Sequence, residues 1–299
     1  HLHSATILIT NMNAEILHEG VVNFNDNTNP KAILTRITRS IEKMVGDEEK
    51  MASILGVGIA LPGLIDYEAG SILSTHSLKE GEGFPIKTFL EDSLDTKVYM
   101  ENDVKTITLG EYHWGAGQQA KNVVYIWLGE GIGAGIIING DIYRGITASA
   151  GEVGYTEISA RGINRGKYPI LYQDQRRFGE ILTTQHLEFS MQQAASSNGR
   201  MTILKDAEIN LQSIASAAKN NDELALDALK EFGEILGILT IGVINLFNPE
   251  LIIMGGPVID KCPMVLDSAT RSAKADVLLI PAEVVKIKAG ALKNRAGTL

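Results

Sequence analysis

One amide and two carboxylates stand where this sequence could bind and activate a hydroxyl group. Asn102 and Asp103 lie where a predicted strand ends and a predicted helix begins, and α/β sheets bind ligands at such strand ends. A carboxylate there can accept a proton from a hydroxyl. Glu152 lies between glycines in the run 150–154. From local sequence alone, a helix N-cap is the commoner role for Asn102 or Asp103, and a lone loop glutamate is usually a solvated charge.

A glycine-rich segment, 129–135, follows one predicted strand and enters another. Closely spaced glycines let backbone N–H groups approach a ligand, and a tight β-hairpin needs the same residues. We weigh these two interpretations equally. The segment does not match a dinucleotide-binding fingerprint, because no helix clearly follows it within a βαβ unit.

Residues that bind metals or nucleic acids are sparse. The six histidines include no pair spaced i, i+4 on a predicted helix, and the single cysteine, Cys262, excludes an internal disulfide and a cysteine-rich zinc site. We therefore expect no metal. A basic stretch runs from Arg161 to Arg177 with few aromatic side chains, so a solvated loop explains it better than nucleic-acid binding does.

The composition is that of a globular protein of about two domains. Of 299 residues, 44% are hydrophobic and 21% are charged, and 27 Lys and Arg against 36 Asp and Glu give a net charge of −9. Most of the surface of so acidic a protein does not suit binding to the phosphate backbone of a nucleic acid. The longest nearly apolar stretch, 236–247, is shorter than the ~18 residues of a membrane span. Because the first residues also lack the basic region of a signal peptide, we expect a cytoplasmic protein without membrane contact.

Strand and helix patterns alternate along the first part of the chain. Apolar residues at helical spacing between Ile33 and Met44 predict a helix that the charged run 47–50 closes. The apolar run Ile54–Leu61 predicts a strand buried on both faces. The other predicted elements here are a β-meander (Ala5–Thr10, Glu15–His18, Val21–Phe24), a helix (Phe84–Leu94), a strand (Lys97–Glu101) and a helix from Asn102 to Trp114.

A second unit begins near Lys121. Its predicted elements are strands at Val123–Leu128, Ile136–Ile138 and Leu251–Met254, a hairpin turn at Asn139-Gly140, and helices from Phe178 to Phe247 that stop at Asn248-Pro249. One stripe of the last helix is apolar from Leu229 to Leu246. The alternation of strands and helices predicts an α/β architecture.

Several different short motifs follow one another along the chain. They are Pro62-Gly63, Glu101-Asn102-Asp103, Leu109-Gly110-Glu111, Gly115-Ala116-Gly117, Leu128–Gly135, Asn139-Gly140, Tyr143-Arg144-Gly145, Gly151-Glu152-Val153-Gly154 and Asn248–Gly256. In this order and spacing, the chain resembles the ROK family of repressors, open reading frames and sugar kinases. The resemblance implies a two-lobed, actin-like ATPase (ribonuclease H-like) α/β fold. It implies a smaller lobe at 1–115, a larger lobe with dimerisation helices at 116–299, and a sugar cleft between them.

The resemblance also implies roles for single residues. The family's sugar contacts correspond to Asn102, Asp103 and Glu152, and Ser77 is the nearest counterpart of a further contact, usually an asparagine. Asp103 would be the general base if the protein were a kinase. The residues of its nucleotide-binding loops correspond to Gly129, Gly131, Gly133, Gly255 and Gly256.

Departures from the family pattern fall in the nucleotide and zinc regions. His1-Leu2-His3-Ser4 stands where the family has a glycine-rich phosphate loop, and Glu130 replaces a usual threonine, so that a carboxylate would face a polyphosphate. Tyr155 replaces the histidine of the family's zinc cluster, and 159–175 lacks its cysteines. We therefore expect degenerate nucleotide binding, no cofactor and no zinc, with Tyr155 as a candidate sugar contact.

These features favour one function over two alternatives. We expect the effector-sensing and oligomerisation region of a ROK-type transcriptional regulator of sugar metabolism, binding a small sugar or sugar phosphate as a homodimer or homotetramer. The family's winged helix-turn-helix and its complete final helix are not in these 299 residues, so we expect DNA contact only through a domain outside this chain. The alternatives are an ATP-dependent ROK sugar kinase and a dimer scaffold that binds nothing.

Overall fold

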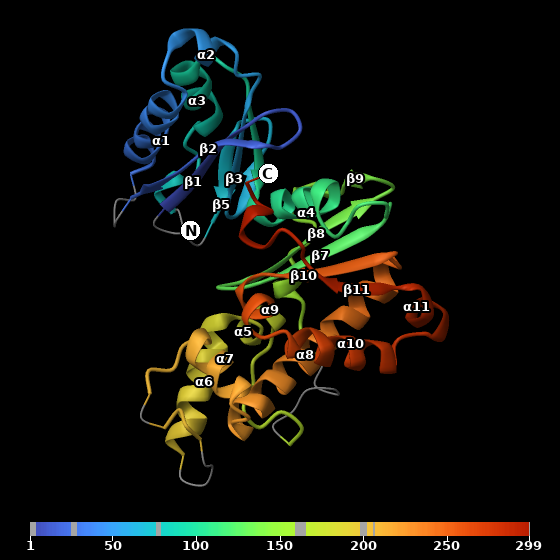
Figure 1. Cartoon of the computed structure of the whole chain (residues 1–299). Coiled ribbons are helices and arrows are strands. Elements are labelled where there is room, and N and C mark those ends of the chain that lie inside the picture. The colour runs from blue at the N-terminus through green and yellow to red at the C-terminus, as the bar shows by residue number, and fades with distance from the viewer. Residues whose placement is uncertain are drawn as a thin grey trace. The chain divides into compact units, whose positions relative to one another are not determined.

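The chain folds into two compact units (Figure 1). The computed structural model describes residues 4–24, 29–75, 79–158, 166–197, 202–205 and 207–298. Unit 1 comprises His1–Gly110, Gly145–Ser149 and Arg295–Leu299, and unit 2 comprises Glu111–Arg144 and Ala150–Asn294. The chain therefore returns to unit 1 twice after its first passage into unit 2.

Unit 1 combines short sheets with packed helices. Its strands are β1 (Ser4–Thr10), β2 (Ile16–Asn23), β3 (Val57–Leu61), β4 (Leu64–Asp66), β5 (Ser71–Ser74) and β6 (Val98–Asn102). Its helices are α1 (Pro30–Val45), α2 (Glu48–Ala52), α3 (Ile86–Leu94) and the 3₁₀ turn η1 (Lys79–Gly81), and α4 (Asp103–Trp114) runs from unit 1 into unit 2.

The chain begins as one antiparallel hairpin, β1–β2. Its turn is closed by the hydrogen bond from Ala14 N to Asn11 O (3.0 Å). The predicted meander is wrong because β2 continues through Gly20 without a break. A Cβ on Gly20 would lie 3.0 Å from Met44 Sδ of α1, so this glycine permits close packing of the helix and does not form a turn.

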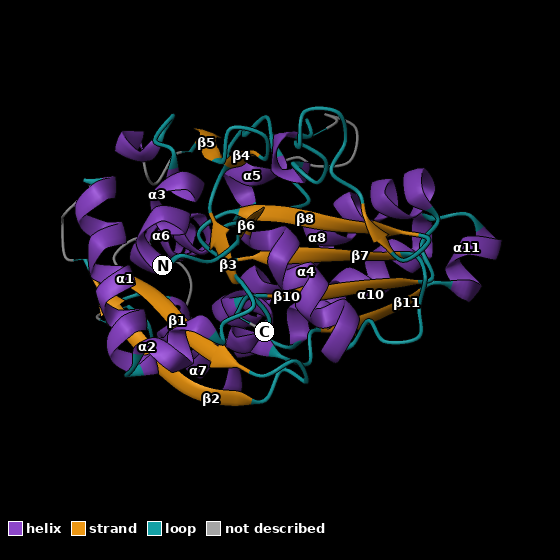
Figure 2. Ribbon diagram, turned by 90° about the horizontal axis from the view of Figure 1, so that it is seen from above, coloured by secondary structure: helices purple, strands orange, loops and turns teal. Residues whose placement is uncertain are grey.

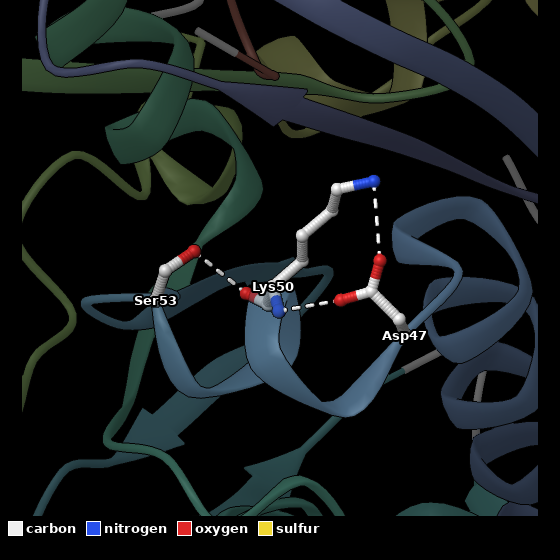
Figure 3. Close-up of polar contacts among 3 residues, drawn as sticks. All are labelled: Asp47, Lys50 and Ser53. Carbon is white, nitrogen blue, oxygen red and sulfur yellow. Dashed lines mark hydrogen bonds and ion pairs between the residues drawn. The ribbon is translucent and has the colours of Figure 1, made fainter.

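The charged run after α1 starts a new helix and does not close the old one. The α1 helix ends at Gly46, whose φ is +96° and whose N–H bonds Glu42 O (2.9 Å). Figure 3 shows Asp47 capping α2 through Lys50 N (2.8 Å), with Lys50 Nζ 3.2 Å from its other oxygen. The hydrogen bond from Lys50 N lowers the pKa of Asp47. Ser53 Oγ then donates to Lys50 O (2.7 Å) at the end of this single turn.

Strands β3 and β6 pair in parallel, with Leu61 opposite Asn102. Gly58 and Ala60 of β3 are exposed, so the predicted burial of this strand on both faces is wrong. Its inner residues pack with Leu34 of α1 and Leu90 of α3 in one apolar cluster. The pairing of β3 with β6 brings the loop after β3 beside the start of α4.

Unit 2 is built on a five-stranded sheet in the order β11-β10-β7-β8-β9 (Figure 2). Its strands are β7 (Val123–Leu128), β8 (Ile132–Ile138), β9 (Asp141–Ile142), β10 (Leu251–Gly255) and β11 (Lys286–Ala289). Its helices are α5 (Phe178–Ile181), α6 (Thr184–Ser196), α7 (Leu211–Lys219), α8 (Glu223–Phe247), α9 (Pro257–Lys261), α10 (Met264–Asp276) and α11 (Leu279–Val284). Two 3₁₀ turns are η2 (Val153–Tyr155) and, at its end, η3 (Lys293–Arg295).

The β8 strand is longer than predicted and includes glycines. Gly133 pairs with Trp127 of β7, and Gly135 pairs with Tyr125. Each glycine thus has a large aromatic residue as its cross-strand partner, an arrangement that can compensate for a glycine in a strand. The predicted turn at Asn139-Gly140 is confirmed, because both residues have positive φ (54° and 94°) between β8 and β9.

Helix α8 packs closely along α10 in unit 2. A Cβ on Gly233 would lie 2.5 Å from Ser268 Cβ, and Gly237 likewise approaches Ser272. The predicted apolar stripe is buried from Leu229 to Val243, whereas Leu246, in the last turn, is 80% exposed. No helix in the described part of the chain has the length and hydropathy to span a membrane.

Candidate functional site

Asn102 ends β6 and caps helix α4. Its Oδ1 accepts a hydrogen bond from Lys105 N (3.1 Å), and its Nδ2 donates to Gly63 O and to Asp103 Oδ1 (3.1 Å each). The N-cap interpretation is therefore confirmed for Asn102. Because both amide hydrogens already have acceptors, a ligand hydroxyl must share Oδ1 or replace one of these partners.

Asp103 is the first residue of α4 and is partly buried. Its Oδ1 accepts hydrogen bonds from Val104 N (2.8 Å) and from the Asn102 amide. Burial raises the pKa of the Asp103 carboxyl, and the hydrogen bond from Val104 offsets this only in part. A carboxylate with a raised pKa is a stronger base, so Asp103 is suited to accept a proton from a bound hydroxyl.

The loop after β3 and the loop after β5 meet at Gly63. The φ of Gly63 is +103°, and a Cβ there would overlap Ser74 O and Thr75. Thr75 is buried and its N–H donates to Glu82 Oε1 (2.8 Å). These contacts hold Thr75 beside the carbonyl that Asn102 uses. The predicted contact Ser77 lies outside the described residues.

Sequence reasoning missed two charged residues beside Asn102. Glu101 Oε1 accepts hydrogen bonds from Asn102 N (2.8 Å) and from the Tyr67 hydroxyl. Lys105 is only 2% exposed, and its Nζ donates to Ala148 O (3.0 Å). A signal existed, because Lys105, Thr108 and Glu111 recur at helical spacing on α4 and all three are buried. Polar residues in the buried phase of a helix indicate partners that sequence alone does not name.

Glu152 and Tyr155, the other two predicted sugar contacts, lie in unit 2 at η2. Gly151 has φ +96°, leaves no room for a Cβ beside Ala134 O, and accepts a hydrogen bond from Ala134 N (2.8 Å). This anchors the turn to β8. Glu152 is exposed, as expected of a loop glutamate. Tyr155 is 55% exposed, and the guanidinium of Arg177 lies 5.3 Å from the centre of its ring.

The predicted nucleotide loops are partly brought together in unit 2. Residues 129–131 form the three-residue turn of the β7–β8 hairpin, so the hairpin interpretation describes them. Gly256, with φ +101° after β10, lies so close to Leu128 O that a Cβ would overlap it. Gly129 leaves a Cβ only 3.4 Å from Pro257 of α9. Gly133 lies within β8, and Gly131 borders open space.

The loop 159–175 is expected to lack zinc ligands, and side chains of two helices hold its described part, 166–175. The carboxylate of Glu231, on α8 and 8% exposed, accepts hydrogen bonds from Ile170 N and Leu171 N (3.0 Å each). His186 of α6 bonds Leu171 O through Nε2 (2.7 Å). Among the described residues, no group of three His, Cys, Asp or Glu side chains could hold a metal ion. Cys262 is buried, and burial raises its pKa to about 11.

Comparison with known families decides the kinship of the chain. The ROK family matches residues 2–299. The chain belongs to the ROK family. The predicted resemblance is thus confirmed, and with it the mixed α/β, actin-like ATPase fold.

The relatives of this ROK protein include both regulators and kinases. It is 31% identical to the xylose repressor of Bacillus spizizenii over 72% of this chain and 51% of the repressor. It is 30% identical to the glucokinase of Halalkalibacterium halodurans over 95% of this chain and 86% of that enzyme. The aligned part therefore spans about half of the repressor and most of the kinase. A solved ROK family transcriptional regulator, a homologue of the Escherichia coli MLC protein, has a TM-score of 0.85 at 24% identity, over 99% of this chain and 73% of its own.

Of the departures expected in the nucleotide region, one lies in the described residues. Glu130 is exposed at the tip of the β7–β8 turn, beside the glycines that correspond to the second phosphate loop. The other departure, His1-Leu2-His3-Ser4, lies outside the described residues except for Ser4, which begins β1.

Proposed function

We propose that this chain is the effector-sensing region of a ROK-type transcriptional regulator of sugar metabolism. One observation carries the proposal: Glu130 presents a carboxylate on the turn where a kinase would bring backbone N–H groups to nucleotide phosphates. A carboxylate repels a polyphosphate unless a cation intervenes. Among the residues that correspond to the sugar contacts, Asn102, Asp103 and Glu152 are present, whereas Ser77 and Tyr155 stand where the family usually has an asparagine and a histidine.

A small sugar or sugar phosphate is the proposed effector. Asn102, Asp103, Ser77, Glu152 and Tyr155 are its proposed contacts, and hydroxyl groups suit carboxylate and amide partners. Regulation requires that the effector bind one conformation of the protein better than another. The proposal includes a homodimer or homotetramer, testable by light scattering, and contact with DNA through a domain outside this chain.

A paired assay tests the proposal. ADP release is measured over a panel of pentoses, hexoses, N-acetylhexosamines and their phosphates with Mg-ATP, and the same panel is screened for an increase in melting temperature. The expected result is at least one sugar that raises the melting temperature without catalytic ADP release. Asp103→Ala is the matched control and should abolish the increase. Sustained ADP release with any sugar, lost in Asp103→Ala, would overturn the regulator assignment.

The second candidate function is an ATP-dependent ROK sugar kinase. The alignment with a glucokinase along 95% of the chain favours it, as does the raised pKa of the buried Asp103 carboxyl, which suits a general base. In this function Asp103 would take the proton from the sugar hydroxyl that attacks the γ-phosphate. The third alternative, a scaffold, would be supported if no sugar changed the melting temperature.

A further inference from the structure

The first turn of α4 contains a buried lysine, Lys105, that is not among the proposed sugar contacts. Lys105 is two residues after Asp103, is 2% exposed, and ranks among the largest fully buried side chains of the described chain. Removing an ammonium from water costs several kcal/mol unless its partners compensate. An apolar side chain would fill the same space without this cost, so the charge itself calls for an explanation.

Lys105 contacts two functional parts of unit 1 at once. Its backbone N–H donates to Asn102 Oδ1 (3.1 Å), and its Nζ donates to the carbonyl oxygen of Ala148 (3.0 Å). The charge also acts on Asp103, whose pKa it lowers slightly against the dominant effect of burial. Backbone and side chain of one residue thus connect the Asn102-Asp103 pair with the segment 145–149.

At the segment 145–149 the chain leaves unit 2, packs in unit 1 and returns to unit 2. Its five residues belong to unit 1, whereas Arg144 and Ala150 on either side belong to unit 2 and are joined by the hydrogen bond from Ala150 N to Arg144 O (3.0 Å). Ala148 has φ +60°, a conformation that costs a non-glycine residue free energy and persists only where surrounding contacts hold it. The ammonium of Lys105 is such a contact.

The segment 145–149 is followed closely by a proposed sugar contact. Glu152 follows Ala148 by four residues, and Gly151 between them is fixed on β8 through Ala134 N (2.8 Å). With one end held by Lys105 and the other by β8, the chain has little freedom between Ala148 and Glu152.

We propose that Lys105 is a positioning residue: by holding the Ala148 carbonyl it sets the path of the chain into Gly151-Glu152 and couples this path to a sugar bound at Asn102 and Asp103. The sugar in this proposal is the ligand of the proposed function, so the sugar-binding test rests on that function. The hydrogen-exchange test does not. The ammonium acts through the Ala148 carbonyl, whereas the bond to Asn102 comes from the backbone N–H and is kept in every Lys105 variant.

The first test needs no ligand. Hydrogen exchange of peptides covering 145–152 is compared among the wild type, Lys105→Met, Lys105→Arg and the control Lys97→Met, which removes an exposed lysine of the same unit. We expect Lys105→Met to speed exchange in 145–152 about tenfold or more, the factor that a hydrogen bond to a charged group represents. Lys105→Arg should restore part of the protection, and Lys97→Met should leave it unchanged. Equal exchange in the wild type and Lys105→Met would overturn the proposal.

The second test uses the sugar that most raises the melting temperature of the wild type. Lys105→Met should weaken its binding about tenfold or more without lowering the melting temperature of the free protein, because the substitution also removes a buried charge. Unchanged sugar affinity, or a loss matched by a fall in melting temperature that Lys105→Arg does not rescue, would contradict a positioning role. If no sugar binds the wild type, the proposed function fails, and the exchange experiment still decides the role of Lys105.

Discussion

Glu111 is a buried carboxylate whose partners among the described residues are backbone N–H groups. It is 1% exposed, and it accepts hydrogen bonds from Ala116 N (2.8 Å), Ala291 N (3.0 Å) and Leu292 N (2.8 Å). Gly115 and Gly290 surround it so closely that a Cβ on either would meet the carboxylate. The motif Leu109-Gly110-Glu111 and the glycine at 115 are therefore explained by packing, and Glu111 needs no catalytic role.

Replacement of Glu111 by alanine should destabilise the protein strongly. Three N–H groups would lose the buried carboxylate that accepts from them, and a hydrogen bond to a charged group contributes about 1.5–3 kcal/mol, so we expect a fall of about 3–5 kcal/mol in the free energy of unfolding. Urea unfolding measures this, with Glu208→Ala as the control at an exposed glutamate. The loss of free energy of unfolding in Glu111→Gln should lie between those of Glu111→Ala and Glu208→Ala, because the glutamine amide keeps one acceptor oxygen. A loss below about 1 kcal/mol in Glu111→Ala would contradict this role.

Asp103 should make the stability of the protein depend on pH in a specific direction. Burial raises the pKa of its carboxyl in the folded state, so the folded protein binds this proton more tightly than the unfolded chain, whose aspartates titrate near ~3.9. The stability of the wild type relative to Asp103→Asn should therefore fall as pH rises from about 4 through the folded-state pKa. Asparagine keeps the Oδ1 acceptor for Val104 N and is the suitable variant.

Urea unfolding of both proteins between about pH 4 and 7.5 gives the difference curve. At neutral pH the asparagine variant should be as stable as the wild type or more stable, although its sugar binding should be weaker. A difference curve that is flat or rises with pH would show that burial does not raise this pKa.

The sequence identified Asn102 and Asp103 as candidates because strand-to-helix junctions are recognisable from local patterns. Lys105 and Glu101 were not predicted, since their importance comes from Ala148 and Tyr67, residues distant in the sequence. A buried charge can be interpreted only once its partner is known.

At the level of elements, strong periodicity was a reliable guide and glycine was not. The strand at Val123–Leu128 and the long helix before Asn248 have the predicted type and position. Gly20, Gly133 and Gly135 were treated as breaks, yet all three lie within strands, because Met44, Trp127 and Tyr125 pack against or opposite them. Such cross-strand neighbours are invisible in a local pattern.

The loop that precedes α5 was predicted to lack the family's zinc ligands. Its described part, from 166 onward, is held by Glu231 and His186, which lie on α8 and α6. We therefore expect chelators such as EDTA and 1,10-phenanthroline to leave the melting temperature unchanged. Glu231→Ala should lower the free energy of unfolding by about 2–5 kcal/mol, because two buried N–H groups lose their acceptor.

Calorimetry of the wild type with and without chelator checks the first expectation, and urea unfolding of Glu231→Ala the second. Exposed Glu157 provides a matched control as Glu157→Ala. A fall in melting temperature on chelation, reversed by added zinc, would show that a metal orders this protein after all.

At the scale of the whole molecule, the path of the chain could not be read from the sequence. The expected lobes, 1–115 and 116–299, are two continuous ranges. In the compact units of the structure, the segments 145–149 and 295–299 both belong to unit 1. No change in composition marks either segment. Only the folded contacts reveal that a short stretch such as 145–149 packs with a different unit from its neighbours.

The proposed loss of nucleotide binding makes a prediction about coupling. In a functional kinase, sugar and nucleotide bind at one reaction centre, and each changes the affinity of the other by the same factor. Under the proposed function the exposed carboxylate of Glu130 would oppose the nucleotide, so the Kd of the sugar should change less than ~5-fold when millimolar Mg-AMP-PNP is added. Isothermal titration calorimetry in both conditions measures this factor. Glu130→Thr removes the repulsion and should increase nucleotide binding, whereas Glu157→Ala should not. Coupling above ~5-fold in the wild type would mean that the nucleotide half of the protein still works, and the kinase function would then be favoured.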